Sequence, residues 1–239
     1  MDRFVSWHDN LHAPLYRVLL RIAGLWMLAT MGYYVALPAF GYHLSYNAAP
    51  VAIACYFLVW AVISFLFFLD LFRAWSDGGS RLWWYGGVSL ACSAVVWGLL
   101  YALSLLPVLQ GPQMAPYSDL LLSTPWYFLP KSVDILVQQI LTAALILALH
   151  FRLGSFKKVL IGYGVCFGGA HVLLYALSDA PPPYALIMTV GALLSTLVFP
   201  YLIVRVREGF VYAYAIHLVF YILLAMLLHT WPPPGYFGA

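Results

Sequence analysis

The chain has 239 residues, of which 64% are hydrophobic and 8% are charged, whereas a soluble domain carries roughly 25% charged residues. This composition excludes a soluble globular domain and indicates an all-α, polytopic membrane bundle. The net charge of +3 does not indicate a nucleic-acid partner, because the basic residues sort by loop. We therefore expect the chain to be embedded in a lipid bilayer and to bind no nucleic acid.

Seven apolar runs, each about 20 residues long and so able to cross a hydrocarbon core of roughly 30 Å, predict seven transmembrane helices. They cover residues 16–37, 49–72, 83–106, 130–151, 157–178, 184–204 and 210–228. Every Lys and Arg except Lys131 lies near the N-terminus or after the second, fourth or sixth run. Because cationic loops stay on the cytoplasmic side, the N-terminus is predicted to be cytoplasmic and the C-terminus outside. We expect the membrane to be a bacterial inner membrane.

The spacing of the runs predicts a single membrane domain over residues 1–239. Its parts are an interfacial lead-in at 1–15, three helices within 16–106, a Pro-rich outer loop at 107–130, a four-helix core at 130–228 and a tail at 229–239. A short interfacial helix is predicted inside the loop, around Tyr117 to Leu122. The third helix also carries small residues that let a neighbour approach closely, namely Gly86, Gly87, Ser89 and Ser93.

The fourth run contains polar residues that a helix facing only lipid would not carry. Asp134 and Gln138 are four residues apart and share a helix face, whereas Gln139 points about 100° round the axis. An ionisable residue inside a membrane helix indicates a functional site. Asp134 lies only about one turn from the outer end, so an ordinary interfacial aspartate is the alternative.

Two further runs each contain a histidine in apolar surroundings, His171 and His217. Gly164 and Gly168 precede His171 and form a face on which another helix can pack. With a rise of 1.5 Å per residue, Gln138, His171 and His217 lie about 12, 10 and 16 Å below the outer edge. We therefore expect them to meet in one polar pocket, although a single buried histidine is also compatible with ordinary core packing.

In these residues the chain resembles the CPBP family of CAAX-prenyl endopeptidases and bacteriocin-processing intramembrane proteases. The family's Phe-xxx-His motif is matched by Phe167 and His171. Its His-xxx-Asn motif is matched by His217, with Tyr221 in the asparagine position. Its pair of glutamates falls on Gln138 and Gln139. The resemblance covers roughly residues 125–230, and it implies a protease-like four-helix core.

The two glutamines decide what the resemblance implies about activity. In the family a glutamate is understood to activate water, and such a role needs a group that accepts a proton near neutral pH. A glutamine amide does not, although it still forms hydrogen bonds. The expected function is therefore that of a pseudo-protease: a non-catalytic scaffold or accessory subunit of a larger membrane complex, with other membrane proteins as its partners.

Two alternatives stay open. In the first, Asp134 supplies the missing carboxylate, and the chain is an active intramembrane endopeptidase in which His171 and His217 hold water and the oxyanion. In the second, His171 and His217 bind a metal or a pigment as axial ligands. The main hypothesis expects no cofactor.

Overall fold

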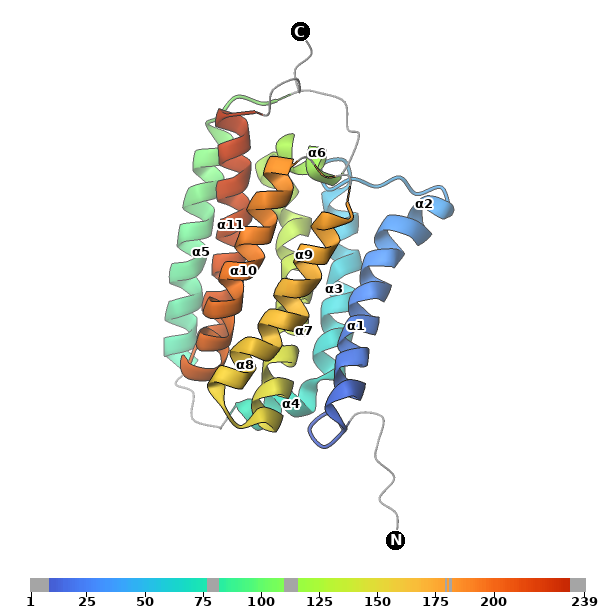
Figure 1. The fold of residues 1–239 in the computed structure, drawn as a ribbon. Helices are drawn as coiled ribbons and strands as arrows, with labels where there is room; N and C mark the ends of the chain where they lie inside the picture. Colours follow the sequence, from blue (N-terminus) through green and yellow to red (C-terminus); the bar gives the residue numbers. More distant parts are fainter. Residues whose placement is uncertain (1–8, 77–81, 110–115, 179, 181, 233–239) are drawn as a thin grey trace. The chain divides into compact units, whose positions relative to one another are not determined.

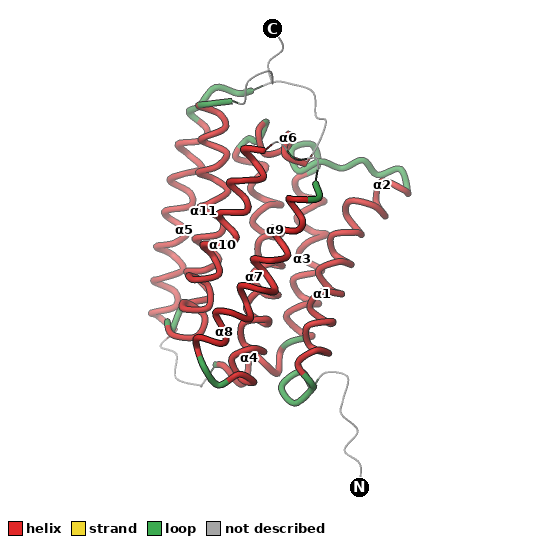
Figure 2. Tube along the Cα trace, in the orientation of Figure 1, coloured by secondary structure: helices red, strands yellow, loops and turns green. Residues whose placement is uncertain are grey.

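A computed structural model of the chain describes residues 9–76, 82–109, 116–178, 180 and 182–232. In this described part every regular element is a helix, as Figure 2 shows in red. An apolar chain in lipid must satisfy its backbone N–H and C=O groups within itself, and a helix does so within one segment. The prediction of an all-α membrane bundle is confirmed.

All seven predicted spans are present as helices long and apolar enough to cross a membrane (Figure 1). Four consist mainly of one helix each: α3 (Pro50–Phe67), α5 (Leu82–Ser104), α10 (Pro182–Arg205) and α11 (Gly209–Thr230). The fourth span joins the 3₁₀-helix η2 (Pro125–Tyr127) to α7 (Phe128–Leu153).

The first and fifth spans are each interrupted by a π-helix. The first runs through α1 (Leu15–Met31), η1 (Gly32–Ala36) and α2 (Leu37–Ala39). The fifth runs through α8 (Phe156–Tyr163), η3 (Gly164–Gly168) and α9 (Gly169–Ala176). Such π-helical turns are rare and frequently lie at functional sites.

Two short helices lie outside the spans. α4 (Leu69–Trp75) follows α3 directly, and α6 (Pro116–Leu121) confirms the short helix predicted within the outer loop. Residues 110–115 of that loop, 1–8 of the lead-in and 233–239 of the tail lie outside the described residues.

The chain divides into two compact units. Unit 1 comprises residues 1–27, 63–81 and 139–213, and unit 2 comprises residues 28–62, 82–138 and 214–239. In unit 1, α10 packs along α8, η3 and α9. A Cβ on Gly168 would lie 3.0 Å from Thr196 and 3.3 Å from Leu193, so the predicted glycine face does pack against another helix.

Several aromatic side chains of unit 2 pack around Tyr46. The Tyr46 ring lies 5.5 Å from that of Tyr33, 6.1 Å from that of Phe57 and 5.3 Å from that of Tyr127. The Tyr33 hydroxyl donates to the Leu44 carbonyl at 2.8 Å. These contacts hold the segment before α3 against the ends of the neighbouring helices and bury Tyr46, which is 5% exposed.

Candidate functional site

A buried ion pair lies in the first turns of α7. Lys131 Nζ is 2.9 Å from Asp134 Oδ2, and the two residues are 8% and 9% exposed. The spacing of three residues places both side chains on one helix face. Taking two charges out of water is costly, and such a pair is tolerated only where further hydrogen bonds complete it.

Two neighbours complete the pair at Asp134. The Tyr46 hydroxyl donates to Asp134 Oδ2 at 3.1 Å, and Gln138 Nε2 donates to Oδ1 at 2.9 Å. Both carboxylate oxygens therefore accept hydrogen bonds, in addition to the contact with Lys131. Burial, reinforced by the nearby Asp134 charge, raises the pKa of Tyr46 well above its usual range, so this phenol keeps its proton and acts as a donor.

The ammonium of Lys131 also contacts aromatic rings. Its Nζ lies 4.1 Å from the centre of the Tyr221 ring and 5.8 Å from that of Tyr46, within the range of cation–π attraction. The Tyr221 ring stacks on His217 with the centroids 5.6 Å apart. Six residues of unit 2 are thus linked by contacts. We call them the ion-pair cluster: Tyr46, Lys131, Asp134, Gln138, His217 and Tyr221.

Asp119 extends the polar contacts of unit 2 beyond the spans. The backbone N–H of Tyr46 donates to Asp119 Oδ2 at 3.4 Å, and Asn47 Nδ2 donates to the Asp119 carbonyl at 3.0 Å. Burial raises the pKa of the Asp119 carboxyl. The segment that places the Tyr46 phenol on Asp134 is therefore itself held by α6.

His171 belongs to unit 1. Its Nδ1 lies 2.9 Å from the Phe167 carbonyl, and since a carbonyl only accepts, Nδ1 carries the proton and donates. In the neutral ring Nε2 then holds the free lone pair. The Phe167 ring packs on the His171 ring at 4.3 Å and on Tyr163 at 5.1 Å. Gln139 also lies in unit 1, with 0% exposure.

The structure thus joins some of the predicted site residues. Asp134 and Gln138 are hydrogen-bonded as their spacing predicts, and His217 contacts Tyr221. Phe167 and His171 contact each other in unit 1. The meeting of Gln138, His171 and His217 in one pocket stays a prediction.

A metal site would need a cluster of suitable side chains. No group of three or more His, Cys, Asp or Glu within the described ranges is placed to hold a metal ion. A metal or pigment bound by His171 and His217 alone stays a hypothesis.

Sequence reasoning missed Lys131 and Tyr46 as members of the site. For Lys131 a signal was present, because a lysine three residues before an aspartate in an apolar helix predicts a pair on one face. For Tyr46 there was none. It lies 88 residues from Asp134, and many other tyrosines occur in the chain.

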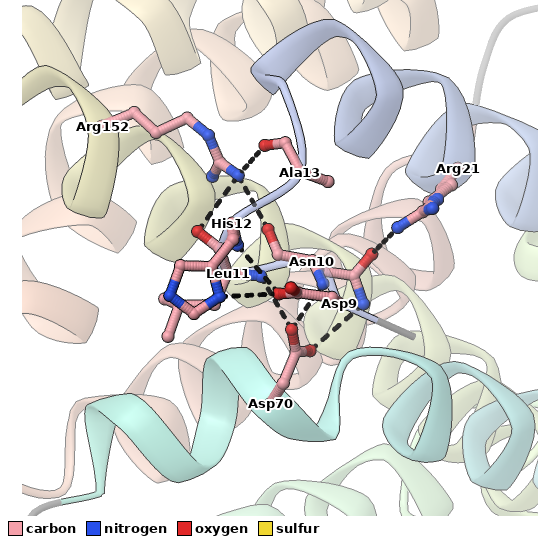
Figure 3. A network of polar contacts seen from close by, with 8 residues as sticks. All are labelled: Asp9, Asn10, Leu11, His12, Ala13, Arg21, Asp70 and Arg152. Carbon is pink, nitrogen blue, oxygen red and sulfur yellow. Dashed lines mark hydrogen bonds and ion pairs between the residues drawn. The ribbon is translucent and has the colours of Figure 1, made fainter. Parts of the chain in front are cut away.

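A second polar cluster, also missed, lies in unit 1 at the end that we predict to be cytoplasmic (Figure 3). The backbone N–H groups of Asn10 and Leu11 donate to Asp70 Oδ2 at 2.5 and 2.7 Å. The Asn10 side chain donates to Asp70 Oδ1 at 3.1 Å and accepts from Arg21 at 2.7 Å. The Asp70 carboxylate thus binds a turn of backbone much as an anion binds a helix N-terminus.

Arg152, near the end of α7, binds the backbone carbonyl groups of the same turn. Its guanidinium donates to the carbonyls of Asn10 at 2.7 Å, of Leu11 at 3.3 Å and of Ala13 (Figure 3). Residues 10, 11 and 13 are therefore bound by a carboxylate on α4, a guanidinium on α7, or both. We call these contacts the N-terminal latch.

Comparison with known proteins adds no relative: the chain matches no protein-family model, no curated protein and no solved structure. The likeness to CPBP proteases therefore rests on the motif residues alone. The seven helices, each long and apolar enough to span a bilayer, indicate an integral membrane protein.

Proposed function

We propose that this chain is a non-catalytic, CPBP-like integral membrane protein that acts as a scaffold or accessory subunit of a larger membrane complex. The observation that carries the proposal is an outward stripe of small residues on α5. Gly87, Ala91, Ala94 and Gly98 follow one another at spacings of four, three and four, and all four are exposed. They therefore form one narrow face of the helix.

Among the described residues, nothing packs closely against the two glycines of this stripe. A Cβ added to Gly87 or Gly98 would meet no described atom within 4 Å. In the most apolar stretch of α5 only 17% of the residues are buried in the protein, against 78% in the span that contains α7. Small residues allow two membrane helices to approach closely, so the stripe suits a helix of a partner protein.

The non-catalytic part of the proposal is supported by the ion-pair cluster. Asp134, which is hydrogen-bonded to Gln138, is the carboxylate that the peptidase alternative uses as its base. It is engaged by Lys131, Tyr46 and Gln138. Both of its carboxylate oxygens are therefore already in contact with protein groups. Gln138 and Gln139 cannot replace it in this role.

The first test replaces the two glycines of the stripe with larger side chains. Gly87→Leu combined with Gly98→Leu is expected to release the partner from complexes purified in mild detergent, because overfilling a close-packed contact costs about 1–3 kcal/mol. The readout is the amount of protein that co-elutes with the chain, together with crosslinking in native membranes. Gly169→Leu is the matched control, since a Cβ there also meets nothing within 4 Å but lies on α9.

Three results would contradict the proposal. The first is a chain that remains alone after crosslinking in native membranes, and the second is a complex that survives both glycine replacements. The third is cleavage of a membrane-anchored peptide that disappears in Asp134→Asn and in His171→Ala, which would make the chain a peptidase. A visible absorbance band from the purified protein would favour the pigment alternative.

The setting we propose is a bacterial inner membrane, with the N-terminus in the cytoplasm and the C-terminus outside, because the basic residues alternate between loops as described. Alkaline phosphatase, which is active only outside the cytoplasm, is expected to be active when fused after Ala239. Fused after Gly154, in a connection predicted to be cytoplasmic, it is expected to be inactive. Activity after Gly154 and none after Ala239 would mean that the topology is the inverse of the one proposed.

A further inference from the structure

The interior of unit 1 contains a polar side chain without a partner. Gln139 is 0% exposed, and neither its amide nitrogen nor its amide oxygen has a hydrogen-bond partner among the residues that the structure describes. A buried amide left in this state is strongly unfavourable, and lipid offers no group that could replace the partner.

A second such group lies one helix away. Tyr163 is 0% exposed, and its hydroxyl likewise has no hydrogen-bond partner within the described part of the chain. The side chains of Thr142 and Ser195 lie close enough to influence this hydroxyl, without meeting the geometry of a hydrogen bond. Thr142 follows Gln139 by three residues, so it lies on the same face of α7.

Tyr163 is not free to turn away from this place. Its ring is stacked on that of Phe167, with an angle of 11° between the planes. Phe167 is part of the π-helix η3, which is held close to α10 at Gly168. Ser195 on α10 donates its own proton to the Ala192 carbonyl at 2.7 Å, so it offers only an acceptor to its surroundings.

From these positions we infer that Gln139, Thr142, Tyr163 and Ser195 bind one or more ordered water molecules inside the membrane-spanning part of unit 1. The amide of Gln139 supplies a donor and an acceptor, the Tyr163 hydroxyl supplies both, and Ser195 supplies an acceptor. A buried water makes about three hydrogen bonds to such groups. This water site does not depend on the proposed function.

The water site is tested by X-ray hydroxyl-radical footprinting of the full chain in mild detergent. Radicals formed from ordered water oxidise the side chain beside it, even where bulk solvent has no access. Tyr163 is expected to be oxidised several-fold faster than Phe68, which is also 0% exposed in unit 1. In Gln139→Leu the oxidation of Tyr163 is expected to fall and the melting temperature to drop.

A dry interior gives the opposite results. Tyr163 would then be oxidised no faster than Phe68, and Gln139→Leu would raise the melting temperature, because it removes an unpaired buried amide. Either result overturns the inference. If Gln139→Leu does not fold, the ratio of Tyr163 to Phe68 oxidation in the unaltered chain decides alone.

Discussion

Replacing Lys131 by Met is expected to destabilise the folded chain by about 3–5 kcal/mol, the usual cost of breaking a buried ion pair from one side. The replacement leaves the Asp134 carboxylate buried without its cation and removes the ammonium from the face of Tyr221. Asp134→Asn is expected to have a similar effect, because it leaves Lys131 charged and unpaired. The measurement is unfolding in mild detergent, followed by heat or denaturant.

The control is the double variant Lys131→Met with Asp134→Asn. It contains no buried charge at this place, and the new amide can accept from Gln138 through its oxygen and donate to the Tyr46 hydroxyl oxygen through its nitrogen. We therefore expect the double variant to be more stable than either single one. Effects that add within about 0.5 kcal/mol would mean that the two residues are not coupled, and the ion pair would then have no role in stability.

The second large effect is expected at the N-terminal latch. Asp70→Asn removes the charge that accepts from the backbone N–H groups of Asn10 and Leu11, and a hydrogen bond to a charged group contributes about 1.5–3 kcal/mol. The exchange of these two amide hydrogens is expected to accelerate about tenfold or more, since each 1.4 kcal/mol changes an equilibrium tenfold. Hydrogen–deuterium exchange of the peptide covering residues 9–13 measures this directly.

Two further variants test the specificity of the latch. Arg152→Gln is expected to loosen the same peptide, because the guanidinium binds the carbonyls of residues 10, 11 and 13. Arg73→Gln changes an exposed charge on the same helix as Asp70 and should leave the exchange unchanged. Equal exchange in Asp70→Asn and in the unaltered chain would show that the latch does not hold the segment in solution.

The sequence reasoning succeeded where the physical signal is local. Apolar runs of span length predicted all seven helices, and the spacing of Asp134 and Gln138 predicted their contact. Gly164 and Gly168 predicted a close helix contact, which α10 provides. Each of these signals depends on residues within a few turns of one another, because lipid forces the backbone of an apolar segment into a helix.

The sequence reasoning failed where the partners are far apart in the chain. The ion-pair cluster depends on Tyr46, 88 residues from Asp134, and the latch depends on Arg152, 142 residues from Asn10. The two π-helices were not predicted either. At η1, a Cβ on Gly32 would collide with the Tyr56 hydroxyl, so the reason for glycine there lies in a neighbouring helix.

The sequence by itself therefore determined the class of this protein: seven apolar helices, their order and the charges that predict their orientation. Only the tertiary structure decided which polar groups share a site. It paired Asp134 with Lys131 and Tyr46, and it left the amide of Gln139 buried. The physical reason is that helix formation in a membrane follows from local apolar composition, whereas a buried polar group is satisfied by whichever distant residue the packing brings within hydrogen-bond distance.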